Sequence, residues 1–348
     1  MKNGLLNTWI DKVKLNEHEF NVLQNCERDD CCIERGCSSE FFETISNMLK
    51  SRLPNCVSDF NHQLTTSQCA TNLIKGIFDK LYNDDTIILS TMQEHLNVLN
   101  IFQNKNVKYY DFEVDSYSDI ISKCITDVSG YKGRIIIYMS GTQIKTGTVI
   151  SDIFFEYLKK ELTKISNDVI LILDDVQGMF MIPRNYSIYD LIIGTAHSLV
   201  EDYDVGLLWY TTNTLFDKMS QEIGMREPLW IPNYLPLLDI IIHRRPYILD
   251  FNDLMRNYFD VILKKNNFKI YKNQAQHIFS FDTNKLPFTK QMENMFNEYR
   301  ISIDCVDGSQ RPQTSIRFRA QEVIKYSDSI IEGIDKLKMI IEMLKGSE

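Results

Sequence analysis

Two hydrophobic patterns alternate along the first two thirds of the chain. Short, continuous apolar runs are typical of strands buried on both faces, whereas apolar residues that recur every three or four positions are typical of amphipathic helices. The runs occupy residues 86–90, 134–138, 169–173, 191–194 and 206–210, and the helical spacing covers 40–53, 72–82 and 152–163. Strands alternating with helices predict an α/β fold with a mostly parallel sheet covered by helices on both faces.

The pattern changes after Pro246. A helical stretch at 252–264 precedes a strand-like run at 276–281, a further helix, a second strand-like run at 316–319 and a final helix at about 327–344. This succession predicts a smaller α+β unit at the carboxyl end. We therefore divide the chain into an N-terminal segment packing on both domains (1–55), a large domain (56–245) and a small domain (246–348).

Composition narrows the range of partners. The 348 residues are 44% hydrophobic, enough for a large core, and the formal net charge of -9 comes from mixed acidic and basic residues. No basic stripe suits a nucleic acid, no apolar run approaches the about 18 residues of a membrane span, and the start of the chain lacks the apolar run of a secretory signal. We expect a cytoplasmic protein that binds neither nucleic acid nor membrane.

Eight cysteines are a low density for a disulfide-stapled scaffold, so we expect reduced thiols. Four of them gather near the start of the chain, as Cys26, Cys31, Cys32 and Cys37. Their spacing, with four residues on each side of a Cys-Cys pair, differs from the Cys-x2-Cys of zinc sites. A structural metal stays an alternative there, but the prediction is that the protein holds none.

Polar residues follow four of the predicted strands directly. Because ligands of parallel α/β sheets bind at the carboxyl ends of the strands, these residues form the candidate site. A carboxylate facing a pyridinium nitrogen, an aromatic plane above the ring and hydroxyls on a phosphate would together bind pyridoxal phosphate. The positions are Glu94-His95, Gly141-Thr142-Gln143, Asp174-Asp175-Val176-Gln177 and Thr195-Ala196-His197.

In this order, and over about residues 60–340, these motifs resemble those of the class V aminotransferase and cysteine desulfurase family, which are pyridoxal-phosphate enzymes of fold type I. The segment Thr66-Ser67-Gln68-Cys69-Ala70 resembles the family's phosphate-binding turn, where backbone N–H groups at a helix start meet the anion. The resemblance implies that Ser67, Gln68 and Cys69 contact the phosphate.

The ring contacts follow from the same resemblance. His95 matches the histidine that stacks on the pyridine ring, Asp174 the carboxylate that pairs with the ring nitrogen, and Gln177 the residue that reaches the ring hydroxyl. Gln143 is a further candidate for binding the cofactor. Simpler roles exist, because a histidine often fills a surface or core position and Asp pairs often cap helices. Placement directly after apolar strands favours the binding roles.

One position departs from the family. Thr195-Ala196-His197-Ser198 aligns with Ser-x-His-Lys, in which the hydroxyl and the imidazole hold the phosphate and the lysine forms the internal aldimine. Ser198 replaces that lysine, and the glycine-containing strand that follows at 204–209 supports the alignment. The nearest candidates to replace it are poor, since they lie in a different loop and its helix: Lys145, Lys159 and Lys160.

Three further positions bear on the substrate. Arg317 matches the arginine that grips the α-carboxylate of the family's amino-acid substrates, a role suited to its bidentate fork. Residues Trp230-Ile231-Pro232-Asn233 replace a Gly-Thr-Pro-Asn-like turn through which the partner subunit touches the phosphate. Cys305 lies too early for a desulfurase nucleophile and suits a buried small hydrophobe, so we do not expect desulfuration.

Without the lysine, ordinary transamination is not expected, because loss of a general base alone costs about 10²–10⁴ in rate. The first hypothesis is an atypical amino-acid-transforming enzyme that holds pyridoxal or pyridoxamine phosphate non-covalently, with His95 as a candidate base. The second is a catalytically silent relative that serves as a binding or scaffold partner of another protein. The third is an engineered lysine-to-serine variant.

Assembly is a further implication of the resemblance. Family members place the cofactor near a dimer interface, which implies a homodimer of about 80 kDa from a chain of 40.8 kDa. The apolar residues after Pro232, namely Tyr234, Leu235, Leu237 and Leu238, belong either to that interface or to a core helix.

Overall fold

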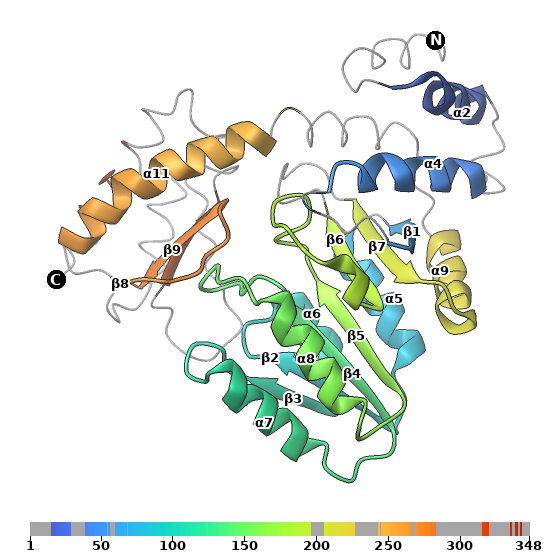
Figure 1. Ribbon diagram of the computed structural model, residues 1–348, viewed down its shortest axis with the longest axis horizontal. Coiled ribbons are helices and arrows are strands. Elements are labelled where there is room, and N and C mark those ends of the chain that lie inside the picture. Colours follow the sequence, from blue (N-terminus) through green and yellow to red (C-terminus); the bar gives the residue numbers. More distant parts are fainter. Residues whose placement is uncertain are drawn as a thin grey trace.

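A seven-stranded, mostly parallel sheet forms the centre of the protein (Figure 1). The structure is a computed structural model that describes residues 15–28, 39–53, 55, 60–67, 69–195, 205–226, 243, 245–265, 269–282, 315–319, 335, 338–339 and 342. Strands β2 to β6 are parallel, and β7 runs antiparallel to both of its neighbours, β6 and β1. The order is β1-β7-β6-β5-β4-β2-β3. The strands are β1 (His62–Ser67), β2 (Thr86–Thr91), β3 (Val107–Tyr110), β4 (Arg134–Ser140), β5 (Val169–Asp174), β6 (Leu191–Thr195) and β7 (Gly206–Thr211).

Helices cover both faces of this sheet, which explains why its central strands are apolar throughout. Successive side chains of a strand point to opposite faces. In β4, Ile135 and Ile137 join the core beneath α4, α7 and α8, whereas Ile136 and Tyr138 join the core beneath α5, α6 and α9. The helices are α4 (Ser39–Lys50), α5 (Ala70–Leu81), α6 (Leu96–Phe102), α7 (Tyr117–Asp127), α8 (Asp152–Leu162) and α9 (Thr214–Arg226). The predicted fold class is confirmed.

All five predicted strands of the sheet are present, but two further strands were not predicted. The sequence of β1, His-Gln-Leu-Thr-Thr-Ser, is polar, and yet its last four residues are buried. Strand β3 lies at the open edge of the sheet, where most of its residues reach solvent, so it shows no apolar run. Neither strand carries the pattern by which buried strands are recognised.

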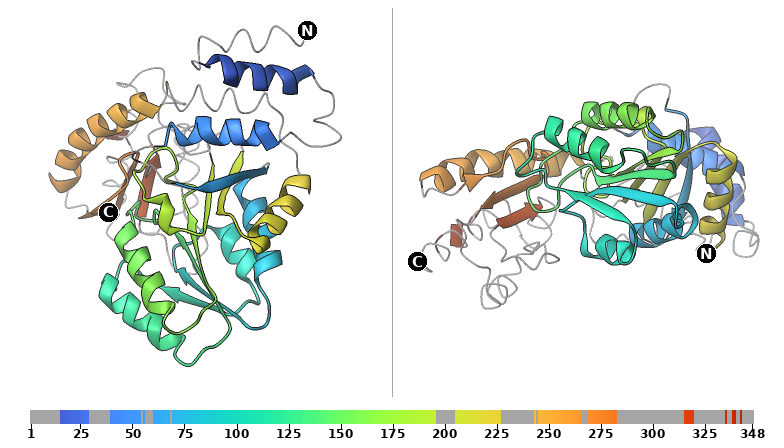
Figure 2. Two further views of the ribbon diagram at one scale, coloured as in Figure 1. Left: turned by 45° about the vertical axis from the view of Figure 1, so that its right-hand side comes forward. Right: turned by 90° about the horizontal axis from the view of Figure 1, so that it is seen from below.

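At the amino end, helix α2 (Glu17–Arg28) lies over α4, which contacts β1 (Figure 2). At the carboxyl end, a long helix, α11 (Arg245–Lys265), packs on a small sheet ordered β10-β9-β8. Its strands are β8 (Lys269–Ile270), β9 (Ile278–Asp282) and β10 (Ser315–Arg319).

Both predicted C-terminal strands are thus present, as β9 and β10. The predicted helix at 327–344 lies mostly outside the described residues. The domain boundaries stay a prediction. Helix α11 begins at Arg245, beside the boundary that was expected near Pro246. None of the helices in the described ranges is both long and apolar enough to cross a membrane.

Candidate functional site

The strand register brings the predicted site residues to one edge of the sheet. Ser67 at the end of β1 pairs with Gly206, which pairs in turn with Thr195 at the end of β6. In the adjoining strands, Asp174 at the end of β5 pairs with Ser140 at the end of β4. The hydroxyl groups of Ser67 and Thr195 and the carboxylate of Asp174, which belong to three separate sequence motifs, therefore lie at the same edge of the sheet. This edge, defined by the ends of β1, β6, β5, β4 and β2, is called the carboxyl edge below.

Asp174 lies at the centre of the carboxyl edge and is only 7% exposed. Its Oδ2 accepts a hydrogen bond of 2.5 Å from the Tyr138 hydroxyl, and its Oδ1 accepts one of 3.1 Å from the Val176 N–H. Burial raises the pKa of Asp174, against the effect of these hydrogen bonds and of the nearby His95 imidazole. A cation brought to this carboxylate would relieve the cost of burying its charge.

A second buried carboxyl, Glu94, lies beside it. Ser140 donates twice to Glu94, from its N–H at 3.0 Å and from its hydroxyl at 2.5 Å. Burial and the neighbouring charge of Asp174 raise the pKa of Glu94 to about 8, although the hydrogen bonds from Ser140 lower it. Glu94 is therefore protonated at neutral pH. The sequence identified Glu94 only as the neighbour of His95, and no pattern signals its burial.

His95 itself begins helix α6 as its N-cap residue. Its Nδ1 accepts a hydrogen bond of 3.2 Å from the Asn97 N–H, and its ring is exposed. The simpler role as a helix cap is thus present, and the imidazole is also close enough to Asp174 to affect the pKa of that carboxyl. Stacking of His95 on a pyridine ring stays a prediction.

Several buried polar atoms near the carboxyl edge have no hydrogen-bond partner in the described structure. They belong to Thr142 and Gln143, which follow β4, to Gln177, which follows β5, and to Ser90 in β2. Unsatisfied buried groups are rare, so each calls for a ligand or a water. The atoms are Thr142 Oγ1, Gln143 Oε1, Gln177 Oε1 and Ser90 Oγ. Such orphaned atoms fit a polar ligand at this edge.

The turn that was predicted to bind phosphate joins β1 to α5. Cys69 is the N-cap of α5, and its side chain makes no capping hydrogen bond to the first turn. Gly206 lies against this turn, because a Cβ at that position would be 2.6 Å from the Cys69 carbonyl oxygen. The buried hydroxyls of Ser67 and Thr195 flank Gly206 through the strand register. The described part of this turn fits an anion at a helix start.

The three lysines considered as replacements for the missing one lie in the loop after β4 and in α8. Lys145 forms an ion pair of 3.0 Å with Glu113, and Lys159 forms one of 2.8 Å with Asp190, at the opposite end of β6. Lys160 is exposed on α8. Lys145 belongs to the loop after β4, and Glu113 also accepts a hydrogen bond of 2.9 Å from Gln93.

Several predicted positions lie outside the described residues: Gln68, His197, Ser198, 230–238 and Cys305, together with Cys31, Cys32 and Cys37. For Arg317 only the backbone is described, and it pairs with Ser280 of β9.

The segment before β9 contacts the loop after β4, since the Val149 N–H donates to the Asn273 carbonyl at 2.9 Å. Within the described ranges, no three His, Cys, Asp or Glu side chains gather as metal ligands.

Two residues of this region escaped the sequence reasoning. Tyr138 is part of an apolar run, so its hydrogen bond to Asp174 has no signal in the sequence. Arg184 follows the turn after β5 and resembles an ordinary loop cation, but its side chain is buried.

Solved structures with the same fold are numerous, whereas no protein-family model and no curated protein sequence matches the chain. A NifS-like protein from Rickettsia africae ESF-5 has a TM-score of 0.65 at 13% identity, over 95% of this chain and 96% of that one. A pyridoxal-phosphate-bound putative aminotransferase from Clostridium difficile 630 has a TM-score of 0.64 at 12% identity, over 94% and 89%.

A multiple substrate aminotransferase from Thermococcus profundus gives a TM-score of 0.61 at 12% identity, over 100% of this chain and 97% of that one. Identities this low establish the fold alone. The chain has the fold shared by these NifS-like proteins and pyridoxal-phosphate aminotransferases.

Proposed function

We propose that the carboxyl edge binds pyridoxal phosphate or pyridoxamine phosphate non-covalently, together with an amino-acid-like carboxylate, and that the protein is an atypical amino-acid-transforming enzyme. The observation that carries this proposal is the buried carboxylate of Asp174 at the end of β5. On one side of it lie the hydroxyl groups of Ser67 and Thr195, and on the other side lies the carboxyl group of Glu94. A protonated pyridine nitrogen is a cation of the kind that this carboxylate lacks.

When bound, the cofactor supplies an electron sink for bonds at the α-carbon of an amino acid. In this proposal Asp174 holds a proton on the ring nitrogen, Gln177 and Gln143 contact the ring, and His95 covers its face. Thr195 and His197, with Ser67, Gln68 and Cys69, surround the phosphate. Arg317 takes the substrate carboxylate through its two-pronged guanidinium. His95 is also the candidate that accepts a proton from the substrate.

The proposal extends to assembly and location. A homodimer of about 80 kDa, from a chain of 40.8 kDa, and a cytoplasmic location follow from the resemblance and the composition. The second candidate function is a catalytically silent relative that binds another protein. Ser198 and the altered segment 230–233 favour it, because both remove a cofactor contact found in the family.

Borohydride labelling tests whether binding proceeds without a covalent anchor. The protein is mixed with pyridoxal phosphate, reduced and mapped by mass spectrometry. We expect the wild-type chain to bind the cofactor without any label at position 198. We expect Ser198→Lys to carry a borohydride-stable label there, because the amine regains a carbonyl partner held in the pocket.

Ser198→Gln is the matched control, since its side chain is polar and of moderate length but has no amine. A Ser198→Lys variant that folds but neither binds nor becomes labelled would contradict the proposal. That outcome would favour the silent binding partner.

A further inference from the structure

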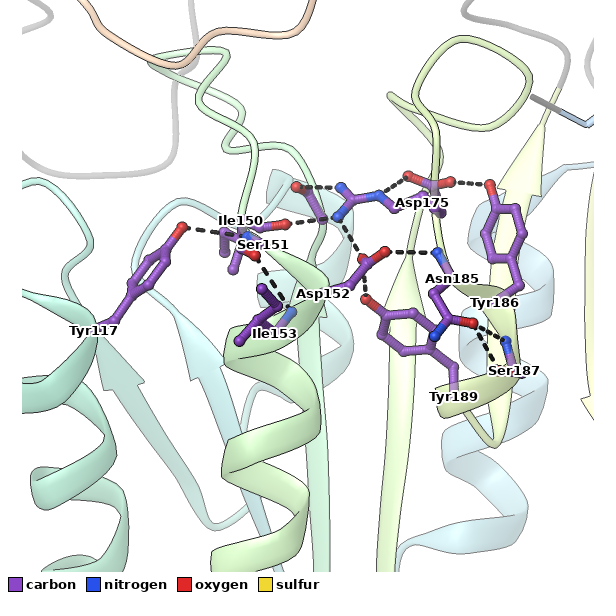
Figure 3. Close-up of polar contacts among 12 residues, drawn as sticks. Tyr117, Ile150, Ser151, Asp152, Ile153, Asp175, Asn185, Tyr186, Ser187 and Tyr189 are labelled. Atoms are coloured by element: carbon purple, nitrogen blue, oxygen red, sulfur yellow. Dashed lines mark hydrogen bonds and ion pairs between the residues drawn. The ribbon is translucent and has the colours of Figure 1, made fainter. Parts of the chain in front are cut away.

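Arg184 has a guanidinium that is buried between two loops directly below the carboxyl edge. Its side chain is 1% exposed. Nη1 donates to the Ile150 carbonyl at 2.6 Å and to Asp152 Oδ1 at 3.1 Å, and Nη2 donates to the Gly141 carbonyl at 2.6 Å. Nε lies 3.7 Å from Asp175 Oδ1. One side chain thus joins four residues from the loop after β4, the start of α8 and the residue after β5. Figure 3 labels three of these partners, Ile150, Asp152 and Asp175.

The loop after β4 spans residues 141–150 and carries Thr142 and Gln143. It closes on itself, because the Ile150 N–H donates to the Gly141 carbonyl at 2.9 Å. Arg184 binds the carbonyl groups at both of these closing residues. The guanidinium therefore fixes the two ends of the loop that carries Gln143.

The other half of the contact is Asp175, the residue after Asp174. Its Oδ2 accepts a hydrogen bond of 2.5 Å from the Tyr186 hydroxyl, and its Oδ1 faces Arg184. Burial alone would lower the pKa of Arg184, but the charges of Asp175 and Asp152 raise it, so the guanidinium stays cationic. Because Asp175 is adjacent to Asp174, the ion pair ties the 141–150 loop to the residue that is proposed to meet the ring nitrogen.

Two glycines make room for this pair. A Cβ at Gly141 would lie 2.6 Å from Arg184 Nη2, and one at Gly178 would lie 2.3 Å from Asp175 Oδ1. Real Cβ atoms do not approach other atoms so closely. The backbone of both loops is therefore shaped around the Arg184–Asp175 pair.

We propose that Arg184 is a positioning residue that holds Gln143 and Asp174 in their binding arrangement before any ligand arrives. This inference rests on the proposed function. A cofactor without a covalent anchor depends for its affinity on contacts that are already ordered, since ordering them upon binding costs affinity. Arg184 acts through these residues, because its guanidinium donates to the Gly141 and Ile150 carbonyl groups and to Asp152.

Substitutions of Arg184, measured by Tm and by the Kd for pyridoxal phosphate, distinguish a positioning role from a purely structural one. Arg184→Met removes the cation beside the buried carboxyl of Asp175 and the hydrogen bonds to two carbonyl groups, so it is expected to lower the Tm strongly. The double variant Arg184→Met/Asp175→Asn removes both charges and keeps an acceptor for Tyr186, so the Tm should recover in part. Its Kd for pyridoxal phosphate should nevertheless stay about 10-fold to 100-fold above that of the wild type. Arg184→Lys keeps the charge but cannot bind both carbonyl groups, so its Kd should also rise.

Leu158→Ala serves as the stability control, because Leu158 is buried in α8, the helix that begins at Asp152, and its truncation is expected to lower the Tm without changing the contacts of the 141–150 loop. Amide hydrogen exchange without any cofactor gives an independent readout. Exchange within residues 141–150 should rise in the double variant and stay at the wild-type level in Leu158→Ala.

Unchanged loop exchange and an unchanged Kd in a folded double variant would overturn the inference. If the wild-type protein binds no pyridoxal phosphate, the proposed function fails instead. The inference about Arg184 is then decided by the exchange measurement alone.

Discussion

At the scale of single residues, the carboxyl edge is distinguished by two buried carboxyl groups that lie beside each other. Asp174 receives hydrogen bonds from Tyr138 and Val176, whereas Glu94 receives two from Ser140 and has its pKa raised to about 8 by burial and by Asp174. Burial raises the pKa of both carboxyl groups. A cationic ring nitrogen at this edge would offset the cost of burying the charge of Asp174.

The protonation of Glu94 predicts a dependence of stability on pH. The unfolded carboxyl ionises near pH 4.5, while the folded one stays protonated up to about pH 8. Between these values the unfolded state binds fewer protons, so the free energy of unfolding falls as the pH rises, by up to about 1.4 kcal/mol per pH unit for this group. Urea unfolding of the wild type and of Glu94→Gln measures the effect, because Gln does not titrate.

The wild type should lose stability relative to Glu94→Gln from pH 5 to pH 8, and the difference should level off above pH 8. Asp175, whose pKa is also raised by burial, contributes to both proteins and largely cancels in the difference. Parallel curves over this range would show that Glu94 is ionised in the folded protein, against this account.

Apolar runs in the sequence indicated that Asp174 and Thr195 end strands and that Gln143 follows one, and the structure has them at the ends of β5 and β6 and three residues after β4. Their roles in binding stay a prediction. Sequence reasoning could not identify Arg184 or the partnership of Tyr138 with Asp174. Burial of a loop arginine depends on carbonyl groups that only the folded loop brings together, and neither Tyr138 nor Arg184 departs from the local pattern.

At the scale of elements, the close approach of β7 to the start of α5 shapes the turn that is proposed to bind phosphate. Strand β1 was not predicted because its polar residues resemble a loop, yet Thr65, Thr66 and Ser67 are buried where the strand meets β7. Which polar residues are buried depends on the neighbouring strand, and a single sequence does not show that neighbour.

Gly206→Ala tests this contact. The added Cβ would lie 2.6 Å from backbone atoms of Cys69 and 2.8 Å from the Ala70 nitrogen, which cannot turn aside as a side chain can. We expect a loss of about 1–3 kcal/mol in the free energy of unfolding, measured by urea denaturation. The proposed phosphate turn should be displaced as well, so that affinity for pyridoxal phosphate falls.

Gly130→Ala is the matched control, since its φ of +75° strains any side chain but no atom lies within 4 Å of the added Cβ. It should cost about 1 kcal/mol and leave affinity unchanged. Equal effects of the two substitutions on affinity would argue against a binding turn at Gly206.

At the scale of the whole molecule, the sheet order brings segments that are distant in sequence to one edge. Residues 67, 94, 143, 174 and 195 come from the ends of five different strands, and the small sheet adds His277, which donates to the Gln177 carbonyl at 2.6 Å. Solved structures of a NifS-like protein and an aminotransferase share the fold over nearly the whole chain. The central claim is that Asp174, at the middle of this edge, binds the ring of a pyridoxal-phosphate-type cofactor.

Equilibrium titration with pyridoxal phosphate, followed by absorbance and by the induced circular dichroism of the cofactor, tests that claim directly. Asp174→Asn removes the charge but keeps an acceptor for Tyr138, and Asp168→Asn, on the exposed opposite end of β5, is the matched control. We predict that the wild type and Asp168→Asn bind alike and that Asp174→Asn binds about 10-fold to 100-fold more weakly, as loss of a charge-assisted hydrogen bond implies. Equal affinities for all three folded proteins, or no binding by the wild type, would contradict the account.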